Sequence, residues 1–160
     1  MTSVFLNTAT LVDALCENFM LAINNGRWVP VLNSDGNWIT HCNDFVSTVA
    51  QRLGYGLLIG KMANDIYDFI STSDDWQKEA SPDLAQLHAT EGALVIAAQK
   101  GFPHGHVCIV RPGNMVMSGK WNTNVPKVVN VGKDVFMDKG VNWAFETPPE
   151  YFCLKSMIQI

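Results

Sequence analysis

Residues 92–110 read GALVIAAQKGFPHGHVCIV, and this stretch decides the fold. Two apolar runs, 93–97 and 106–110, are separated by Lys, Gly and Pro, a pattern typical of short strands joined by a turn. Short runs of similar character follow at 115–117 and 125–131, again separated by Gly, Pro and Asn. With residues 151–158 as a last strand, these runs predict an antiparallel sheet in the second half of the chain.

The residues before this stretch have the apolar spacing of helices. Helical patterns cover residues 7–23, 45–53 (with a start at 40–43) and 61–70. Ser81-Pro82-Asp83 predicts a fourth helix, because Pro is common at an early helical position. Helices followed by strands indicate an α+β fold in which N-terminal helices pack against one face of a C-terminal antiparallel sheet. A length of 160 residues predicts one domain, residues 1–160.

The composition excludes several classes of protein. A hydrophobic content of 48% is enough to build a core, which excludes intrinsic disorder. The net charge is −4 with no run of like charges, which argues against a nucleic-acid partner or an anionic membrane. No apolar stretch reaches the roughly 18 residues needed to span a bilayer. Asp13 and Glu17 lie where the apolar core of a signal peptide would be, so we expect no signal peptide.

The chain has four cysteines without Cys-x-x-Cys spacing, so we predict free thiols. Cys42 differs from the others because it has polar neighbours and lies at the expected start of a helix. Unpaired backbone N–H groups and the helix dipole there favour a thiolate, which makes Cys42 a candidate nucleophile. The alternative is a buried, inert thiol, the more common fate of a cysteine. The other three look like core thiols: Cys16, Cys108 and Cys153.

A cysteine nucleophile needs a base, and His106 is the candidate. It begins the strand 106–110, whose alternation puts it on one face with Cys108 and Val110. The other histidines have weaker claims. His41 is adjacent to Cys42 and should point away from it, His88 lies in a helical pattern, and His104 lies in a turn.

Two residues are candidates for a third, orienting member of the site. If residues 111–113 form a three-residue turn, the antiparallel register puts Ser118 opposite His106 on the same face. Asn130 interrupts an apolar strand, and its side-chain amide can hold an imidazole N–H. A dyad of Cys42 and His106 without a strong orienting group also remains open. The backbone N–H of Cys42 is the expected oxyanion donor, with a side chain from 33–38 as a second.

Residues 40–50 (THCNDFVSTVA), 92–97 (GALVIA) and 105–110 (GHVCIV) resemble the papain-like cell-wall peptidases of the NlpC type. That family has a Cys at a helix N-terminus, then a Gly-led strand, then a Gly-His-Val strand. Asn64, Asp65, Trp76 and the 97–101 turn are most similar to the compact amidase effectors of type VI secretion. The resemblance covers residues 40 to 112, less than half of the chain.

The resemblance implies hydrolysis of amide bonds in peptidoglycan stem peptides, with Cys42 as nucleophile and His106 as general base and then acid. It implies no metal and no organic cofactor. It also implies synthesis in the bacterial cytoplasm, delivery to the periplasm or a target cell by a non-Sec route, and an inhibitory immunity-type protein as partner. The chain departs from the common Asp-Cys-Ser-Gly-Phe motif, because His41-Cys42-Asn43-Asp44-Phe45 is bulkier in the first turn.

Three other interpretations remain open. A papain-like framework also supports a thiol hydrolase, deamidase or acyltransferase acting on another substrate. A non-catalytic binding domain that retains the fold would use Trp121 and its neighbours to hold glycan or peptide. A zinc site would use His41, Cys42, His104 and His106. The spacing argues against zinc, because adjacent His41 and Cys42 cannot easily both reach one ion from a helix start.

Overall fold

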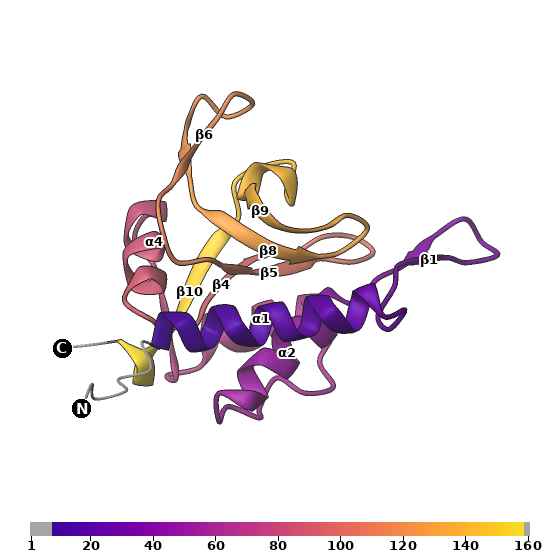
Figure 1. The fold of residues 1–160 in the computed structure, drawn as a ribbon, viewed down its shortest axis with the longest axis horizontal. Helices are drawn as coiled ribbons and strands as arrows, with labels where there is room; N and C mark the ends of the chain where they lie inside the picture. The colour runs from indigo at the N-terminus through magenta and orange to yellow at the C-terminus, as the bar shows by residue number, and fades with distance from the viewer. Residues whose placement is uncertain (1–7, 159–160) are drawn as a thin grey trace.

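The computed structural model describes residues 8–158 and contains a six-stranded antiparallel sheet with the strand order β3-β10-β4-β5-β8-β9 (Figure 1). The strands of this sheet are β3 (Trp76–Lys78), β4 (Val95–Gln99), β5 (His106–Val110), β8 (Lys127–Val131), β9 (Val135–Gly140) and β10 (Glu150–Leu154). The antiparallel sheet predicted from residues 92–110 is therefore confirmed. The strands at its centre are buried on both faces, which explains why their sequences are continuous apolar runs without alternation.

Helices cover both faces of this sheet. The helices α1 (Thr8–Asn24), α2 (Cys42–Arg52) and α3 (Ala63–Thr72) share one apolar core with the strand residues of one face, such as Ile96 and Ile109. The helix α4 (Pro82–Thr90) packs its alanines against the opposite face, beside Ala97 and Cys108. The α+β class is confirmed, but the expectation that all the helices lie on one face is wrong. Because both faces of the strands are apolar, a single layer of helices would leave one face exposed to water.

The helix predicted over 7–23 corresponds to α1, although Asn7 itself lies outside the described residues. The side chains of Asp13 and Arg111 fix α1 to the sheet. Arg111 Nε and Nη2 donate to the two carboxylate oxygens of Asp13 at 2.8 and 2.7 Å, and Arg111 Nη1 donates to the carbonyl of Met137 at 2.9 Å. No described helix is long and apolar enough to cross a membrane.

The strand after β5 differs from the prediction. Residues 111–113 lead into β6 (Val116–Ser118), which leaves the main sheet and pairs with β7 (Thr123–Val125) in a separate hairpin (Figure 1). β5 pairs instead with β8, where Ile109 lies opposite Val129. The predicted strand 125–131 is divided at Pro126, which has no N–H to donate to a sheet.

Other strand boundaries also shift. The last predicted strand, 151–158, ends at Leu154 and continues as a 3₁₀ turn over Lys155–Met157. β9 and the short β3 were not predicted. The second short hairpin, β1 (Val31–Leu32) with β2 (Trp38–Ile39), projects from the molecule immediately before α2 (Figure 1). It lies in the stretch predicted to be mostly loop.

Candidate active site

Cys42 is the first residue of α2, as predicted, and His41 is its N-cap. The His41 side chain does not cap the helix. Its Nδ1 lies 2.9 Å from Asp44 Oδ2, and its ring packs edge-on against Trp28 with centroids 5.3 Å apart. The backbone N–H groups of the first turn have no intrahelical acceptor in an α-helix. His41 leaves them without a side-chain cap, and the N–H groups of Cys42 and Asn43 act on the Cys42 sulfur.

His106 is the first residue of β5, and its ring is held by Asn130 of β8. His106 Nε2 lies 2.5 Å from Asn130 Oδ1, so the ring donates this hydrogen bond to the amide oxygen. The Asn130 amide is itself fixed, because its Nδ2 donates to the carbonyl of Asp134 at 2.8 Å. A shift of register between Val128 and Asn130 accompanies this arrangement in β8. Because Nε2 is occupied, Nδ1 is the imidazole nitrogen left for proton transfer.

The imidazole of His106 also has close packing on other sides. A Cβ added at Gly132 would lie 2.9 Å from His106 Cε1, so the ring lies directly against the Gly132 backbone. The ring of Phe145 lies 5.1 Å from the His106 ring, centroid to centroid. Neither residue was predicted to belong to the site. A glycine directly after a Val-Asn-Val strand was the available signal for Gly132, and nothing in the sequence points to Phe145.

Gly105 and Asn64 shape the turn that leads into His106. A Cβ at Gly105 would collide with the Asn64 side chain and lie 2.6 Å from the carbonyl oxygen of Gln99. Asn64 Nδ2 donates to the Gly101 carbonyl at 2.9 Å, and the Gly101 N–H donates back to Asn64 Oδ1 at 3.1 Å. Only glycine fits at 105, so the Gly-His order of the motif has a steric reason.

The Cys42 thiol lies against the start of β5. The backbone N–H of Val107, the residue after His106, is close enough to lower the pKa of the Cys42 thiol, as do the N–H groups of Asn43 and Cys42 itself. Burial is the larger effect and raises the pKa of Cys42 above its ordinary value, and Asp44 raises it further. Burial lowers the pKa of His106, against the opposing effect of the Asn130 hydrogen bond. The structure thus places the Cys42 thiol at the start of β5, next in sequence to His106, and it places Asn130 on the His106 ring.

The polar neighbours of Cys42 in the sequence suggested a more exposed thiol than the other three, but the structure shows no such difference in exposure. All four are buried, and Cys42 is only 5% exposed. Burial raises the pKa of Cys16 and Cys108 far above the ordinary value, and burial with the nearby Glu79 carboxylate raises that of Cys153 to about 12. Cys42 is distinguished by the backbone N–H groups that face its sulfur.

Ser118 does not lie opposite His106, so the predicted register is wrong. Residue 118 pairs with Thr123 in the separate hairpin, and Ser118 Oγ accepts the backbone N–H of Trp121 at 3.1 Å. The reason is that β5 finds a longer apolar partner in β8 than in β6. Of the two candidate orienting residues, the structure brings Asn130 to His106.

The zinc set considered from the sequence does not assemble. Among the residues that the structure describes, His41, Cys42, His104 and His106 form no group with ligand atoms close enough for one ion. His104 is exposed, in the turn after the cis Phe102–Pro103 bond.

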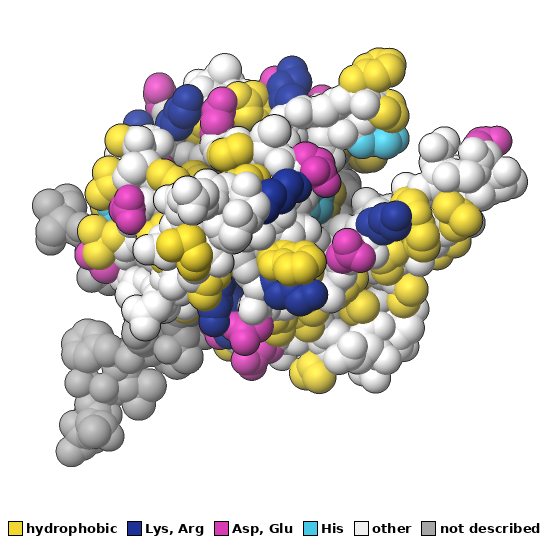
Figure 2. All heavy atoms as spheres, turned by 90° about the horizontal axis from the view of Figure 1, so that it is seen from above, with side chains coloured by type: hydrophobic (Ala, Val, Ile, Leu, Met, Phe, Trp, Pro, Cys, Tyr) yellow, Lys and Arg dark blue, Asp and Glu magenta, His cyan; other side chains and the backbone are white. Residues whose placement is uncertain are grey.

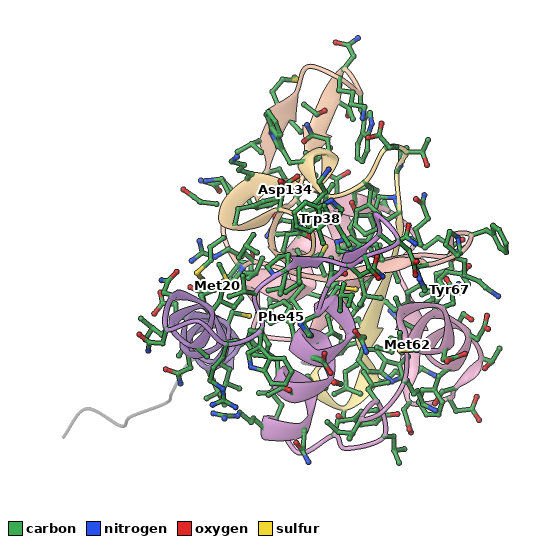
Figure 3. All side chains as sticks on the ribbon, turned by 90° about the vertical axis from the view of Figure 1, so that its right-hand side faces the viewer. Met20, Trp38, Phe45, Met62, Tyr67 and Asp134 are labelled. Atoms are coloured by element: carbon green, nitrogen blue, oxygen red, sulfur yellow. The ribbon has the colours of Figure 1, made fainter. Side chains whose placement is uncertain are left out.

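Trp38 of β2 is 44% exposed. It precedes Cys42 by four residues, and Lys133 Nζ lies 5.5 Å from its ring centroid. Lys133 follows Gly132, so this pair joins the segment before Cys42 to the turn that backs His106. In the view of Figure 3, the labelled Trp38 and Asp134 both lie above Phe45 of α2. Exposed apolar side chains gather along the projecting hairpin (Figure 2).

Comparison with known proteins gives one relative at significant similarity. Over 73 residues the chain is 41% identical to a protein of Pseudomonas aeruginosa named Peptidoglycan amidase Tse1. The match covers 46% of this chain and 46% of that protein, so the chain spans about half the length of the relative that it matches. No protein-family model matches the chain. The resemblance to the NlpC type therefore stays a prediction.

Proposed function

We propose that the protein is a cysteine amidase that hydrolyses amide bonds in the stem peptides of peptidoglycan. The observation that carries the proposal has two parts. Cys42 begins helix α2, and its thiol lies by the backbone N–H of Val107, the residue after His106. The Nε2 atom of His106 is held by Asn130. The similarity to a protein named a peptidoglycan amidase supports peptidoglycan as the substrate.

In this mechanism His106 Nδ1 takes the proton of the Cys42 thiol while Sγ attacks the carbonyl carbon of the amide. His106 then gives the proton to the leaving amine, and a thioester remains on Cys42. Water, deprotonated by His106, then attacks the thioester carbonyl. The carbon–sulfur bond breaks, the carboxylic acid product leaves, and the Cys42 sulfur takes back the proton from His106. Asn130 is a positioning residue, because its hydrogen bond to Nε2 fixes the tautomer that leaves Nδ1 as the base.

The tetrahedral oxyanion needs donors, and the first turn of α2 supplies them. The backbone N–H of Cys42 has no intrahelical acceptor, and the His41 side chain is turned toward Asp44 instead of capping the helix. The N–H of Val107, at the start of β5, also acts on the sulfur. Removing one such donor from an acyl-transfer site typically costs about a hundredfold or more in rate.

The arrangement of a helix that begins at the nucleophile against a sheet that carries His and Asn supports a papain-like fold for one domain over residues 1–160. An immunity-type partner and delivery to the periplasm or a target cell stay predictions of the resemblance. They do not bear on the chemistry of the site.

The test is digestion of purified bacterial peptidoglycan by the wild-type chain, Cys42→Ala, His106→Ala and Cys16→Ala, with muropeptides resolved by mass spectrometry. Cys16 is a buried thiol of α1 and serves as the matched control. We expect amide-cleavage products from wild type and Cys16→Ala and none from the other two variants. Intact muropeptides from folded wild-type protein would exclude the proposed substrate and favour a thiol hydrolase acting elsewhere or a binding domain. Products that persist in Cys42→Ala would exclude the cysteine mechanism.

A further inference from the structure

A second group of reactive side chains lies under α4, away from Cys42. It consists of Glu79, which follows β3, His88 in the last turn of α4, and Cys153 in β10. One ligand atom from each residue lies within 4.8 Å of the other two. It is the one group of three such side chains within this distance among the residues that the structure describes.

The fold itself brings these three residues together. β3 pairs with β10 so that Gln77 lies opposite Cys153, and the Glu79 N–H donates to the carbonyl of Tyr151 at 2.8 Å. Because side chains alternate along a strand, Glu79 and Cys153 share the face of the sheet that α4 covers. His88 reaches this face from the helix, and its Nδ1 lies 2.6 Å from Glu79 Oε1.

One oxygen of this group lacks a conventional hydrogen bond. The Glu79 side chain is fully buried, and its Oε2 makes no hydrogen bond of ordinary geometry within the described chain. The Cys153 thiol is the polar group beside the carboxylate, which raises the pKa of that thiol. A buried carboxylate oxygen normally has a hydrogen-bond donor or a cation beside it, since leaving it unpaired costs a large part of its desolvation energy. The imidazole of His88 satisfies only Oε1.

We propose that Glu79, His88 and Cys153 bind a zinc ion. A thiolate and an imidazole favour zinc over magnesium or calcium, and the carboxylate completes a set of three protein ligands. One carboxylate and one thiolate also balance the charge of Zn²⁺, which is what a buried site requires. Zinc bonds of about 2.0–2.3 Å put tetrahedral ligand atoms about 3.3–3.6 Å apart, so the group needs movements of only about 1 Å.

The zinc site is separate from the candidate active site. Cys153 lies opposite Val95, four residues along β4 from Gln99, which lies opposite His106. With two strand spacings between β10 and β5, strand geometry separates the two sites by roughly 16 Å. The His88 side chain is 15% exposed, which gives the ion a route from solvent and a place for water as fourth ligand. The ion would tie the edge strand β3 and helix α4 to the centre of the sheet.

The test is titration of the full chain, freed of metal by chelation, with Co²⁺ and with Zn²⁺. A Cys42→Ala background removes the other thiol that has a histidine near it. We expect one equivalent of Co²⁺ to give thiolate-to-cobalt charge-transfer absorption in the near ultraviolet. We expect zinc at a hundredfold excess over its Kd to raise Tm by about 5–10 °C. Adding Cys153→Ser or His88→Gln should remove both signals, and adding Cys16→Ala should leave them unchanged.

Absorption that appears in the background protein and is lost in Cys153→Ser and His88→Gln would support the zinc site, with or without a Tm shift. If the background protein shows neither charge transfer nor a Tm shift, the group is a hydrogen-bonded polar cluster and the proposal is overturned. If the absorption persists in Cys153→Ser, another thiol binds the metal and the proposal is also overturned. If Cys153→Ser does not fold, His88→Gln decides alone, because its side chain is not fully buried and the glutamine can keep the hydrogen bond to Glu79.

Discussion

Replacing Asn130 tests the geometry of the proposed active site most directly. Asn130 is 3% exposed, and its Oδ1 lies 2.5 Å from His106 Nε2. Asn130→Ala removes this acceptor. The Nε2–H is then buried without a partner, because the ring still packs against Gly132 and Phe145.

The structure sets the size and the sign of the effect. A buried hydrogen bond to a group that becomes charged during the reaction contributes about 1.5–3 kcal/mol, so kcat/KM should fall about 10- to 150-fold. The Asn130 bond also raises the pKa of His106 against the lowering by burial. Asn130→Ala should therefore move the acidic limb of the kcat/KM profile to lower pH. Asn130→Asp places a negative charge at Nε2 and should move the same limb to higher pH.

The assay is release of amide-cleavage products from soluble peptidoglycan fragments between pH 5 and 9, at temperatures below the Tm of each variant. Asn124→Ala, at an exposed position of β7, is the matched control and should keep wild-type rates and pH dependence. If Asn130→Ala retains kcat/KM within about twofold of wild type, the hydrogen bond does not position the base. If both Asn130 variants move the acidic limb in the same direction, His106 is not the group that this limb reports.

Three further predictions follow from the same structure. Gly132→Ala puts a methyl group 2.9 Å from His106 Cε1 and should lower kcat/KM about 10- to 100-fold. Gly119→Ala is the control, because a Cβ there has nothing within 4 Å, and it should keep the wild-type rate. Equal rates for the two variants would contradict the close contact at Gly132. Asp13→Asn weakens the paired hydrogen bonds to Arg111 and should lower the free energy of unfolding, measured by urea titration, by about 1–2 kcal/mol. An unchanged urea midpoint would show that the packing of α1 does not depend on these hydrogen bonds. The lowered pKa of His106 means that its contribution to stability is complete above pH 6.5 and is lost as the pH falls through the folded value, so wild type should lose stability in acid more steeply than His106→Gln.

Those helices and strands were predictable whose own residues show a clear pattern of apolar spacing. The helices and the strands β4, β5 and β8 follow from apolar spacing and from Gly and Pro at their ends. The topology did not follow, because a run such as 115–117 is compatible with pairing to β5 or with a separate hairpin. The choice depends on β8, which offers five mostly buried residues against the three of β6. β9 was missed because its residues are half exposed and mix apolar with charged side chains.

The site was predictable for related reasons. Cys42 and His106 carry local signals. Cys42 begins α2 among polar neighbours, and His106 begins β5 directly after Gly105. Asn130 could be proposed as a polar interruption of an apolar strand, but only the β5–β8 pairing distinguishes it from Ser118. Phe145 reaches the imidazole from a segment distant in sequence, and no local pattern marks it.

The directions of the two pKa shifts favour one resting state of the proposed enzyme. The helix N-terminus was expected to stabilise a Cys42 thiolate, and the backbone N–H groups do lower the pKa of the thiol, but burial outweighs them. Burial also lowers the pKa of His106. Both shifts favour the neutral thiol beside the neutral imidazole over a preformed thiolate–imidazolium pair. The proton would then move only when a substrate carbonyl is in place and negative charge passes from sulfur to oxygen. The first-turn N–H groups of α2 can act at that point as donors to the oxyanion, because they have no intrahelical acceptor.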